Sequence, residues 1–380
     1  MTTAARAFRR PRIVAWMAEF RSAVWTIMVK ELRSRMRGRR AFVVLTVYLL
    51  VLAAITYAVY QATYQAVSAF AAFGGTAVNA SASIGQAIFT TLSLLQLLLI
   101  AFIAPAFTAG AISLEREKQT LDLLVTTPLR PGAIVVGKLL AALAFALLLI
   151  VAGIPLSAIV LMYGGAAVDD LVRQLFVLIA AAVGFGSIGL FFSALTKRTQ
   201  AATVLTYSAM LVLTLGTTFS YLIWSVMSVA ASSDLGAGGI QRRPPEAILY
   251  LNPFVAMADV IANTEQPNSG GFFTSALAAV RGIDLFGITG GGVVGGGEVV
   301  CQGNTCFERP LGPNVLPADI GGLPAANPPG VTGHFWPRFA LAVGTLALVL
   351  TVVSTRLVAP TGRWLRTRRR PARARSEAVA

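Results

Sequence analysis

Few residues in this chain have a type and spacing that could support catalysis. Residues 132–138, Gly-Ala-Ile-Val-Val-Gly-Lys, match the Gly-x4-Gly-Lys half of a phosphate-binding loop. However, Leu139 occupies the position where a Ser or Thr would bind magnesium. Pro128 and Pro131 precede the segment in place of the strand that such a loop must follow. We therefore expect this chain to bind no nucleotide, metal or other cofactor.

The other reactive side chains also argue against an enzyme. His334 is the one histidine, and the sequence offers no nucleophile–base pair and no metal-ligand cluster. Cys301 and Cys306 are the only cysteines, and Gly303-Asn304 between them could turn the chain back. They lie in a segment that we place outside the membrane, where a disulfide is permitted. We predict a structural disulfide between them.

The composition is that of a membrane protein. Hydrophobic residues make up 56% of the chain and charged residues 12%, against about 45–50% and about 25% in globular domains. An apolar helix of about 20 residues crosses the ~30 Å hydrocarbon layer. Charged residues fall outside or at the ends of the long apolar runs, so proton-coupled carriers and intramembrane hydrolases, which need ionisable residues at membrane depth, are disfavoured. We predict an all-α membrane protein with six transmembrane helices, at 41–60, 87–112, 139–163, 174–195, 201–231 and 339–358.

Residues 1–40 are predicted to form a basic cytoplasmic tail and an amphipathic helix that lies in the membrane interface. A soluble surface helix is the alternative. The first apolar run begins only at Ala41 and is too long for a signal peptide, so we expect the first span to be retained. The apolar positions recur every three to five residues, at Ile13, Trp16, Phe20, Val24, Ile27, Leu32 and Met36.

The net charge of +15 indicates orientation rather than nucleic-acid binding, because the basic clusters directly adjoin the spans. Lys and Arg are enriched in cytoplasmic loops. Placing both termini inside puts twenty-five of the 31 Lys and Arg residues on the cytoplasmic side. We therefore predict a multi-pass protein of the inner (plasma) membrane with both termini cytoplasmic, ending in a basic tail at 359–380.

A cytoplasmic segment at 113–130 combines charge with exposed leucines. Charge returns at Glu115, where the second span ends. A short helix is then predicted, ended by Thr127-Pro128. Exposed apolar residues on a cytoplasmic loop require a partner. The apolar residues are Leu121, Leu123, Leu124 and Val125.

This segment resembles the coupling helix of the type-2 ABC exporter permeases, whose pattern runs Glu-x-Glu-x-Gly-Thr-Leu-Glu-x-Leu-Leu-x-Thr-Pro. Gln119 replaces the usual Gly, and Asp122 replaces Glu. Lys30-Glu31-Leu32, Gly137-Lys138-Leu139 and Asn252-Pro253-Phe254 are also similar to that family, so the resemblance covers most of the chain except 265–335. The matching residues are Glu115, Glu117, Thr120, Leu121, Asp122, Leu124, Thr127 and Pro128.

The resemblance implies that these eight residues couple the membrane helices to an ABC ATPase. It further implies a second permease copy or homologue as partner, and two ATPase subunits that bind ATP and Mg. The expected activity is export of a lipid-like or amphipathic substrate. A mechanical or signalling output is the alternative, and a membrane scaffold without an ATPase is a more distant one.

Residues 232–338 form a large external segment in this topology. The apolar pieces at 247–262 and 272–280 are too short to span, and a polar turn separates them. Non-helical backbone at membrane depth survives only when protein or a water-filled cavity shelters it. We predict a re-entrant pair packed on the fifth and sixth spans, with Phe254 and Phe272 closing the outer end of the pathway. The alternative is that both pieces cap the bundle from outside. Residues 287–333 are expected to be a Gly- and Pro-rich loop or a small hairpin.

Overall fold

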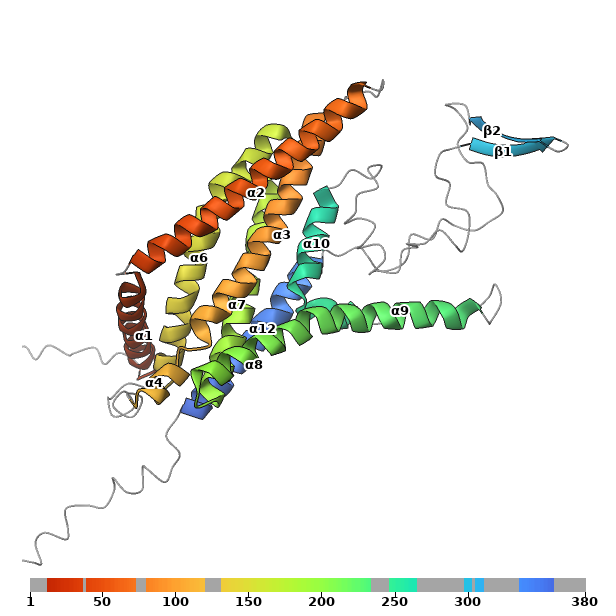
Figure 1. Cartoon of the computed structure of the whole chain (residues 1–380). Coiled ribbons are helices and arrows are strands. Elements are labelled where there is room, and N and C mark those ends of the chain that lie inside the picture. Colours follow the sequence, from red (N-terminus) through yellow and green to blue (C-terminus); the bar gives the residue numbers. More distant parts are fainter. Residues whose placement is uncertain are drawn as a thin grey trace, which may run out of the picture.

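The computed structural model describes residues 12–36, 39–72, 80–119, 131–233, 246–264, 297–302, 305–310 and 335–358. It is an all-α membrane protein with one short β-hairpin (Figure 1). The helices in chain order are α1 Arg12–Met36, α2 Arg39–Ala72, α3 Ala80–Thr108, α4 Ser113–Glu117, α6 Pro131–Tyr163, α7 Val168–Leu195, α8 Thr199–Leu211, η1 Val212–Gly216, α9 Thr217–Ser233, η2 Glu246–Leu251, α10 Pro253–Thr264 and α12 Phe335–Val358.

Among the described residues, 6 helices are long and apolar enough to cross a membrane. This confirms the predicted number of spans, but most of them are longer than predicted. The third begins at Pro131 instead of 139 and the fourth at Val168 instead of 174. The second span, α3, ends at Thr108, and a turn at 109–112 separates it from α4. The uncharged stretch after residue 60 prolongs α2 to Ala72.

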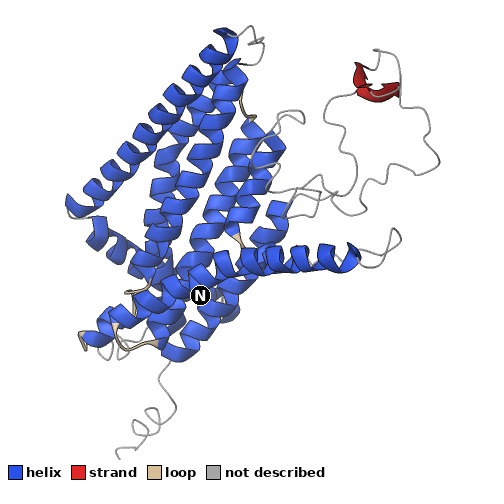
Figure 2. Cartoon of the chain, turned by 45° about the vertical axis from the view of Figure 1, so that its right-hand side comes forward, coloured by secondary structure: helices blue, strands red, loops and turns tan. Residues whose placement is uncertain are grey.

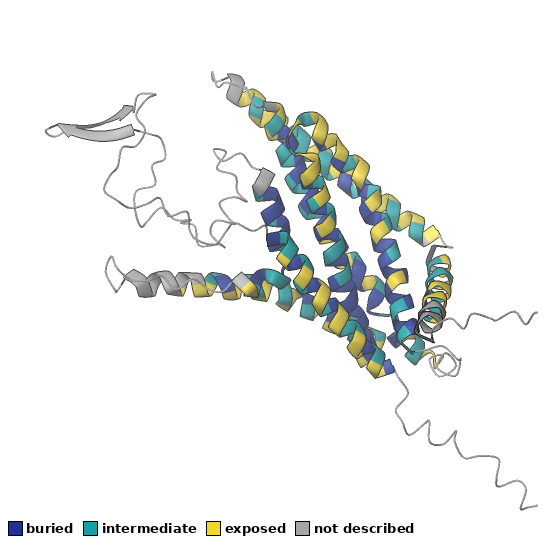
Figure 3. Cartoon of the chain, turned by 180° about the vertical axis from the view of Figure 1, so that it is seen from behind, coloured by how far each residue is buried: buried dark blue, intermediate teal, exposed yellow. Residues whose placement is uncertain are grey.

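The spans differ widely in how far this chain buries them. Helices α3, α6 and α7 pack on one another at the centre of the bundle, and α12 packs along α7. In the most apolar 18-residue stretch of α6, 67% of the residues are buried. The corresponding share is 11% in α2 and 17% in the span from Thr199 to Trp224. Figure 3 shows the buried residues gathered toward the middle of the bundle. Helix α2 and the fifth span therefore present apolar surface to lipid or to a partner.

Helix α1 packs chiefly on α6. Val24 is buried, and the nearest side chains to Gly132 and Gly137 of α6 include Phe20 and Ile27 respectively. Part of the apolar face that we expected to meet lipid therefore covers α6 instead. The basic residues Arg21, Lys30 and Arg33 are exposed. An interfacial position for this helix remains a prediction.

A ridge of small residues on α7 allows three helices to approach it closely. A side chain at Gly184 would meet Val343 of α12, one at Gly186 would meet Leu143 and Leu139 of α6, and one at Gly189 would meet Thr108 of α3. Small residues at such crossings let helix backbones come near enough to pack without a hydrophobic driving force. The ridge therefore serves packing within this chain.

Replacing Gly189 with Ala tests this packing. The added carbon would collide with the Thr108 side chain and come within 3.3 Å of the Ala109 backbone nitrogen. Overpacking of this kind costs about 1–3 kcal/mol. Thermal unfolding of the detergent-solubilised protein should show the loss.

Gly344→Ala on α12 is the matched control, because nothing lies within 4 Å of its added carbon. It should raise stability slightly, since Ala is favoured over Gly in a helix interior by about 0.5–1 kcal/mol. Equal effects of the two substitutions would contradict a close α3–α7 crossing.

The fifth span changes direction at a π-helical segment. Residues Val212–Gly216 (η1) connect α8 to α9, and α9 then leaves the bundle (Figures 1 and 2). The Asn252 amide nitrogen donates to the Thr214 carbonyl oxygen at 2.8 Å and lies 3.1 Å and 2.8 Å from the hydroxyls of Thr217 and Thr218. The side-chain oxygen of Asn252, Oδ1, accepts the backbone N–H of Phe254 at 3.0 Å. One buried side chain thus joins the bend in the fifth span to the start of α10.

The first of the two predicted re-entrant pieces forms η2 and α10. Helix α10 is deeply buried, with Met257, Val260 and Ile261 at 0% exposure. It packs on α7, α3 and α12. The predicted contacts of this piece with the fifth and sixth spans are both present, the fifth through η2 and Asn252 and the sixth through α10 on α12. The contacts of α10 with α7 and α3 were not predicted. Sequence alone does not distinguish these neighbours, because α10 is apolar on more than one face. The second piece, with Phe272, lies outside the described residues.

The hairpin pairs β1, Gly297–Gln302, with β2, Thr305–Pro310. Its register places Cys301 directly opposite Cys306, and Gly303-Asn304, the expected turn between them, lies outside the described residues. The hairpin itself is therefore confirmed. The disulfide stays a prediction, consistent with this backbone register.

Candidate functional site

The candidate coupling site lies where α3 ends and α4 begins. Helix α4 is short, Ser113–Glu117, and it packs beside the start of α8 (Figure 1). The junction is reached by side chains from α6, α7 and α8. Glu115 and Glu117, the acidic motif residues that the structure describes, each have a partner within the chain.

The turn between α3 and α4 is held by Ser193 of α7. Its hydroxyl oxygen accepts the backbone N–H groups of Ile112 at 2.9 Å and Ser113 at 3.0 Å. Ser193 is 0% exposed. An unpartnered N–H at such a site costs free energy comparable to a lost hydrogen bond, so this one hydroxyl allows the chain to leave the second span here.

Glu115 forms an ion pair with Lys138 of α6. The Lys138 Nζ atom lies 2.8 Å from Glu115 Oε1, and the lysine side chain is only 4% exposed. A buried ammonium requires a counter-charge and hydrogen-bond acceptors. The pair therefore explains how α6 can begin at Pro131 and carry a charged residue within its first turns.

Arg116 and Glu117 bind the turn between α7 and α8. Arg116 donates to the Thr196 carbonyl oxygen at 3.2 Å. The Glu117 carboxylate accepts the Thr199 backbone N–H at 2.8 Å and the Thr199 hydroxyl at 3.0 Å. A carboxylate at this position satisfies a free N–H group and complements the positive end of the α8 dipole. Helix α4 is thus fixed to the first residue of the fifth span.

Gln119 shows why the family pattern has Gly at this position. Its φ is 57°, in the left-handed region, where Gly is the residue of lowest steric cost. The chain therefore turns sharply directly after α4, as the family's Gly would allow. The remaining predicted coupling residues, Thr120, Leu121, Asp122, Leu124, Thr127 and Pro128, lie outside the described residues.

The phosphate-loop-like segment 132–138 is the first part of α6, so it forms no loop. The Cβ of a side chain at Gly137 would stand 2.8 Å from Ile27 of α1. This glycine is therefore used for the contact between α1 and α6. Lys138 is already paired with Glu115. The structure gives these residues a packing role.

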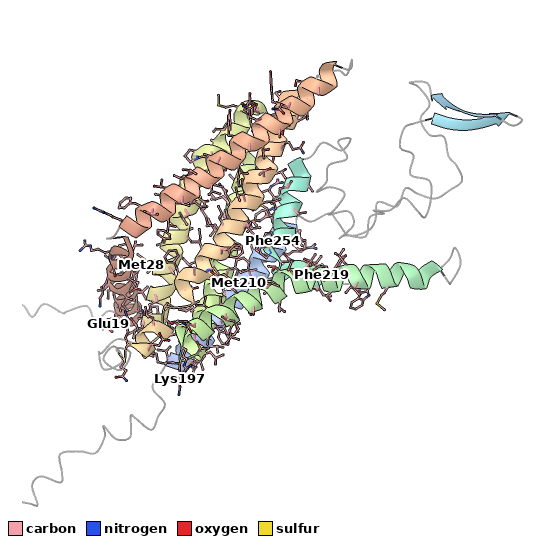
Figure 4. All side chains as sticks on the ribbon, viewed as in Figure 1. Glu19, Met28, Lys197, Met210, Phe219 and Phe254 are labelled. Atoms are coloured by element: carbon pink, nitrogen blue, oxygen red, sulfur yellow. The ribbon has the colours of Figure 1, made fainter. Side chains whose placement is uncertain are left out.

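Phe254, the predicted external gate residue, begins the first turn of α10 and packs partly buried against the core. Figure 4 labels it near the level where α9 leaves the bundle. Its backbone N–H is fixed by Asn252. A gating role remains a prediction.

Comparison with known families agrees with this architecture. A family model described as ABC-2 family transporter protein matches residues 25–288, more than half of the chain. The chain belongs to this family. The match runs from α1 through α10 and contains the whole junction around α4. No curated protein matches the chain.

As an ABC-2 family transporter protein, the chain is a membrane permease subunit of an ABC transporter. The resemblance drawn from the sequence is therefore confirmed at the level of the family. Sequence reasoning identified Glu115 and Glu117, but it did not identify Lys138 and Thr199 as their partners. It also missed Ser193, which holds the turn before α4. Only Lys138 stood in a motif, and nothing in the sequence indicated that it reaches Glu115.

A double-mutant cycle tests the Glu115–Lys138 pair. Glu115→Leu leaves a lysine with a 4% exposed side chain without its carboxylate. Removing one partner of a buried pair costs about 3–5 kcal/mol, whereas replacing both by apolar residues is often neutral. Glu115→Leu and Lys138→Met should each lower the unfolding temperature, and the double variant should regain most of the loss.

Asp169→Asn is the control, because Asp169 is 65% exposed in its pair with Arg173 and exposed pairs contribute little. It should leave the unfolding temperature unchanged. A double variant as unstable as the sum of its single variants would show that the two charges do not interact.

Proposed function

We propose that this permease works in an exporter that moves a lipid-like or amphipathic substrate out of the cytoplasm or the inner leaflet. An ABC ATPase partner, implied by the family, would bind ATP and Mg and press on the segment 113–130. The anchoring of α4 carries this proposal. Because Ser193, Lys138 and Thr199 hold α4 against α7, α6 and α8, a force on the adjoining residues reaches three spans at once.

The proposed orientation places both termini in the cytoplasm and the chain in the plasma membrane. The charge distribution supports this assignment, since the described basic residues Arg21, Lys30 and Arg33 are exposed on α1. Lys197 and Arg198, in the turn before α8, lie at the same end of the bundle as α4. Basic residues on that side agree with the positive-inside rule.

A second permease copy would cover the least buried spans. Helix α2 exposes Phe42, Val47 and Leu50, and α9 exposes Phe219 and Ile223. Such surfaces fit lipid or another apolar helix. A pair of permeases would also give the two ATPase subunits two α4 junctions on which to act.

The apolar character of the spans supports an amphipathic substrate. Among the described charged residues of the third and fourth spans, Lys138 is paired with Glu115, and Arg173 contacts Asp169 and Asp170 near the start of α7. A lipid-like molecule requires no charged residue at membrane depth. An ion would require one.

Reconstitution with an ABC ATPase that forms a complex with this chain tests the function. Vesicles containing the complex and a fluorescent phospholipid should show ATP-dependent movement of that lipid to the leaflet facing away from the ATPase. A catalytically inactive ATPase is the control. ATP hydrolysis that proceeds normally but moves none of a panel of lipids and amphipathic drugs would favour mechanical or signalling work instead.

The docking prediction concerns Leu121 and Leu124. Changing either to Asp would place a carboxylate in an apolar contact, which costs several kcal/mol if the charge is unpaired. The ATPase should then be lost during mild purification, while the amount of permease in the membrane stays the same.

Leu123→Asp is the matched control, because residue 123 falls on a variable position of the family pattern. It should retain the ATPase. If Leu121→Asp and Leu124→Asp also retain it, the docking surface lies elsewhere.

A further inference from the structure

A lateral groove between α6 and α7 contains polar groups that the described packing leaves unused. The groove has a volume of about 240 Å³. Its floor includes Gln96 of α3, Ser157 of α6 and Gln174 of α7, and none of its lining residues is charged. Gln96 and Gln174 are each 2% exposed.

The two amides satisfy each other only in part. Gln174 Nε2 donates to Gln96 Oε1 at 2.9 Å. Gln96 Nε2 and Gln174 Oε1 have no hydrogen-bond partner among the described residues. Rotating both amide groups by 180° leaves the same set of unpaired groups. Two amides joined by one hydrogen bond always leave one NH₂ group and one carbonyl oxygen without a partner. The floor therefore offers one donor and one acceptor.

The lack of a side chain at one position of α6 makes room for the Gln96 amide. Gly153 of α6 faces it, and a side chain at that position would occupy the space of Gln96 Nε2. Ser157 does not supply the missing partner: its hydroxyl donates to the Gly153 carbonyl oxygen, and neither free amide atom has a hydrogen bond to it. Leaving a buried polar group without a partner costs about 1–3 kcal/mol, so an occupant that pairs with both amides would be held.

The mouth of the groove opens toward the hydrocarbon. Ile154, Val168 and Val172 line it and are exposed. This volume is smaller than that of pockets that enclose a drug-sized molecule, which is about 300–1,000 Å³. It suits one lipid chain that lies along the groove while the rest of the molecule stays in the bilayer.

We propose that this groove is a binding site for a single uncharged lipid chain bearing a hydroxyl group. A hydroxyl can donate to Gln174 Oε1 and accept from Gln96 Nε2, so it satisfies both groups. An ester carbonyl can only accept, and a carboxylate would bring an unpaired charge to an uncharged site. The site needs no ATPase and does not depend on the proposed transport function.

Photolabelling of the full-length protein in phosphatidylcholine nanodiscs tests the site. The probes are hexadecanol and hexadecane, each carrying the same diazirine. In wild type, hexadecanol should label peptides of α6 and α7 roughly tenfold more than hexadecane, which corresponds to about 1.4 kcal/mol. Gln96→Leu/Gln174→Leu should abolish the difference. Gln200→Leu, an exposed glutamine on α8, should preserve it.

A second variant keeps the test decisive if the amide variant folds poorly. Ala158 lines the groove and is exposed, so Ala158→Phe should fill it without touching either amide and reduce labelling by both probes. Equal labelling of wild type by the two probes would mean that the amides bind only water, and it would overturn the proposal. So would hexadecanol labelling that survives Ala158→Phe unchanged.

Discussion

Hydrocarbon offers no hydrogen-bond partner to the backbone, and each unsatisfied group costs several kcal/mol there. Three breaks between the described helices show how the chain meets this constraint. Ser193 receives the N–H groups where the second span ends. Asn252 binds the Thr214 carbonyl oxygen where the fifth span bends. Asp259 of α10 accepts the Phe335 N–H at 2.9 Å where α12 begins. In each case the partner comes from another element, so these bonds also fix how the helices are arranged.

The motif around α4 divides its residues between two tasks. Glu115 and Glu117 face the chain itself, because their partners Lys138 and Thr199 belong to α6 and α8. The apolar residues that follow Gln119 in the sequence lie outside the described residues. The acidic residues therefore position α4, and on the proposed function the leucines would provide the contact with a partner subunit. Such a division would explain why the motif contains carboxylates that bind the permease itself.

The sequence was sufficient to predict the six spans, because long apolar runs have few alternatives to a membrane helix. It was insufficient where one element completes another. Lys138 made the predicted third span begin too late, at 139, since a charge is tolerated there only because Glu115 reaches it from α4. The contact between Gln96 and Gln174 was not predicted, because an uncharged amide does not interrupt an apolar run. The packing of α10 on α3 and α7 was also beyond prediction, since its buried residues Ala256, Met257, Val260 and Ile261 suit any apolar surface.

These contacts form a continuous series across the molecule. Glu117 holds the first residue of α8 beside the coupling segment. Helix α8 continues through η1, whose Thr214 carbonyl oxygen is bound by Asn252, and the same Asn252 fixes the first turn of α10. Asp259 then joins α10 to the start of α12. Coupling between distant sites is carried by packed elements and hydrogen-bonded links of this kind. Because Asn252 binds both the bend and α10, the direction of α9 cannot change without straining α10, and through Asp259 the outer end of the sixth span. Movement at α4 would therefore reach α10 and the start of α12 through hydrogen bonds at the ends of helices, a route separate from the central packing of α3, α6 and α7.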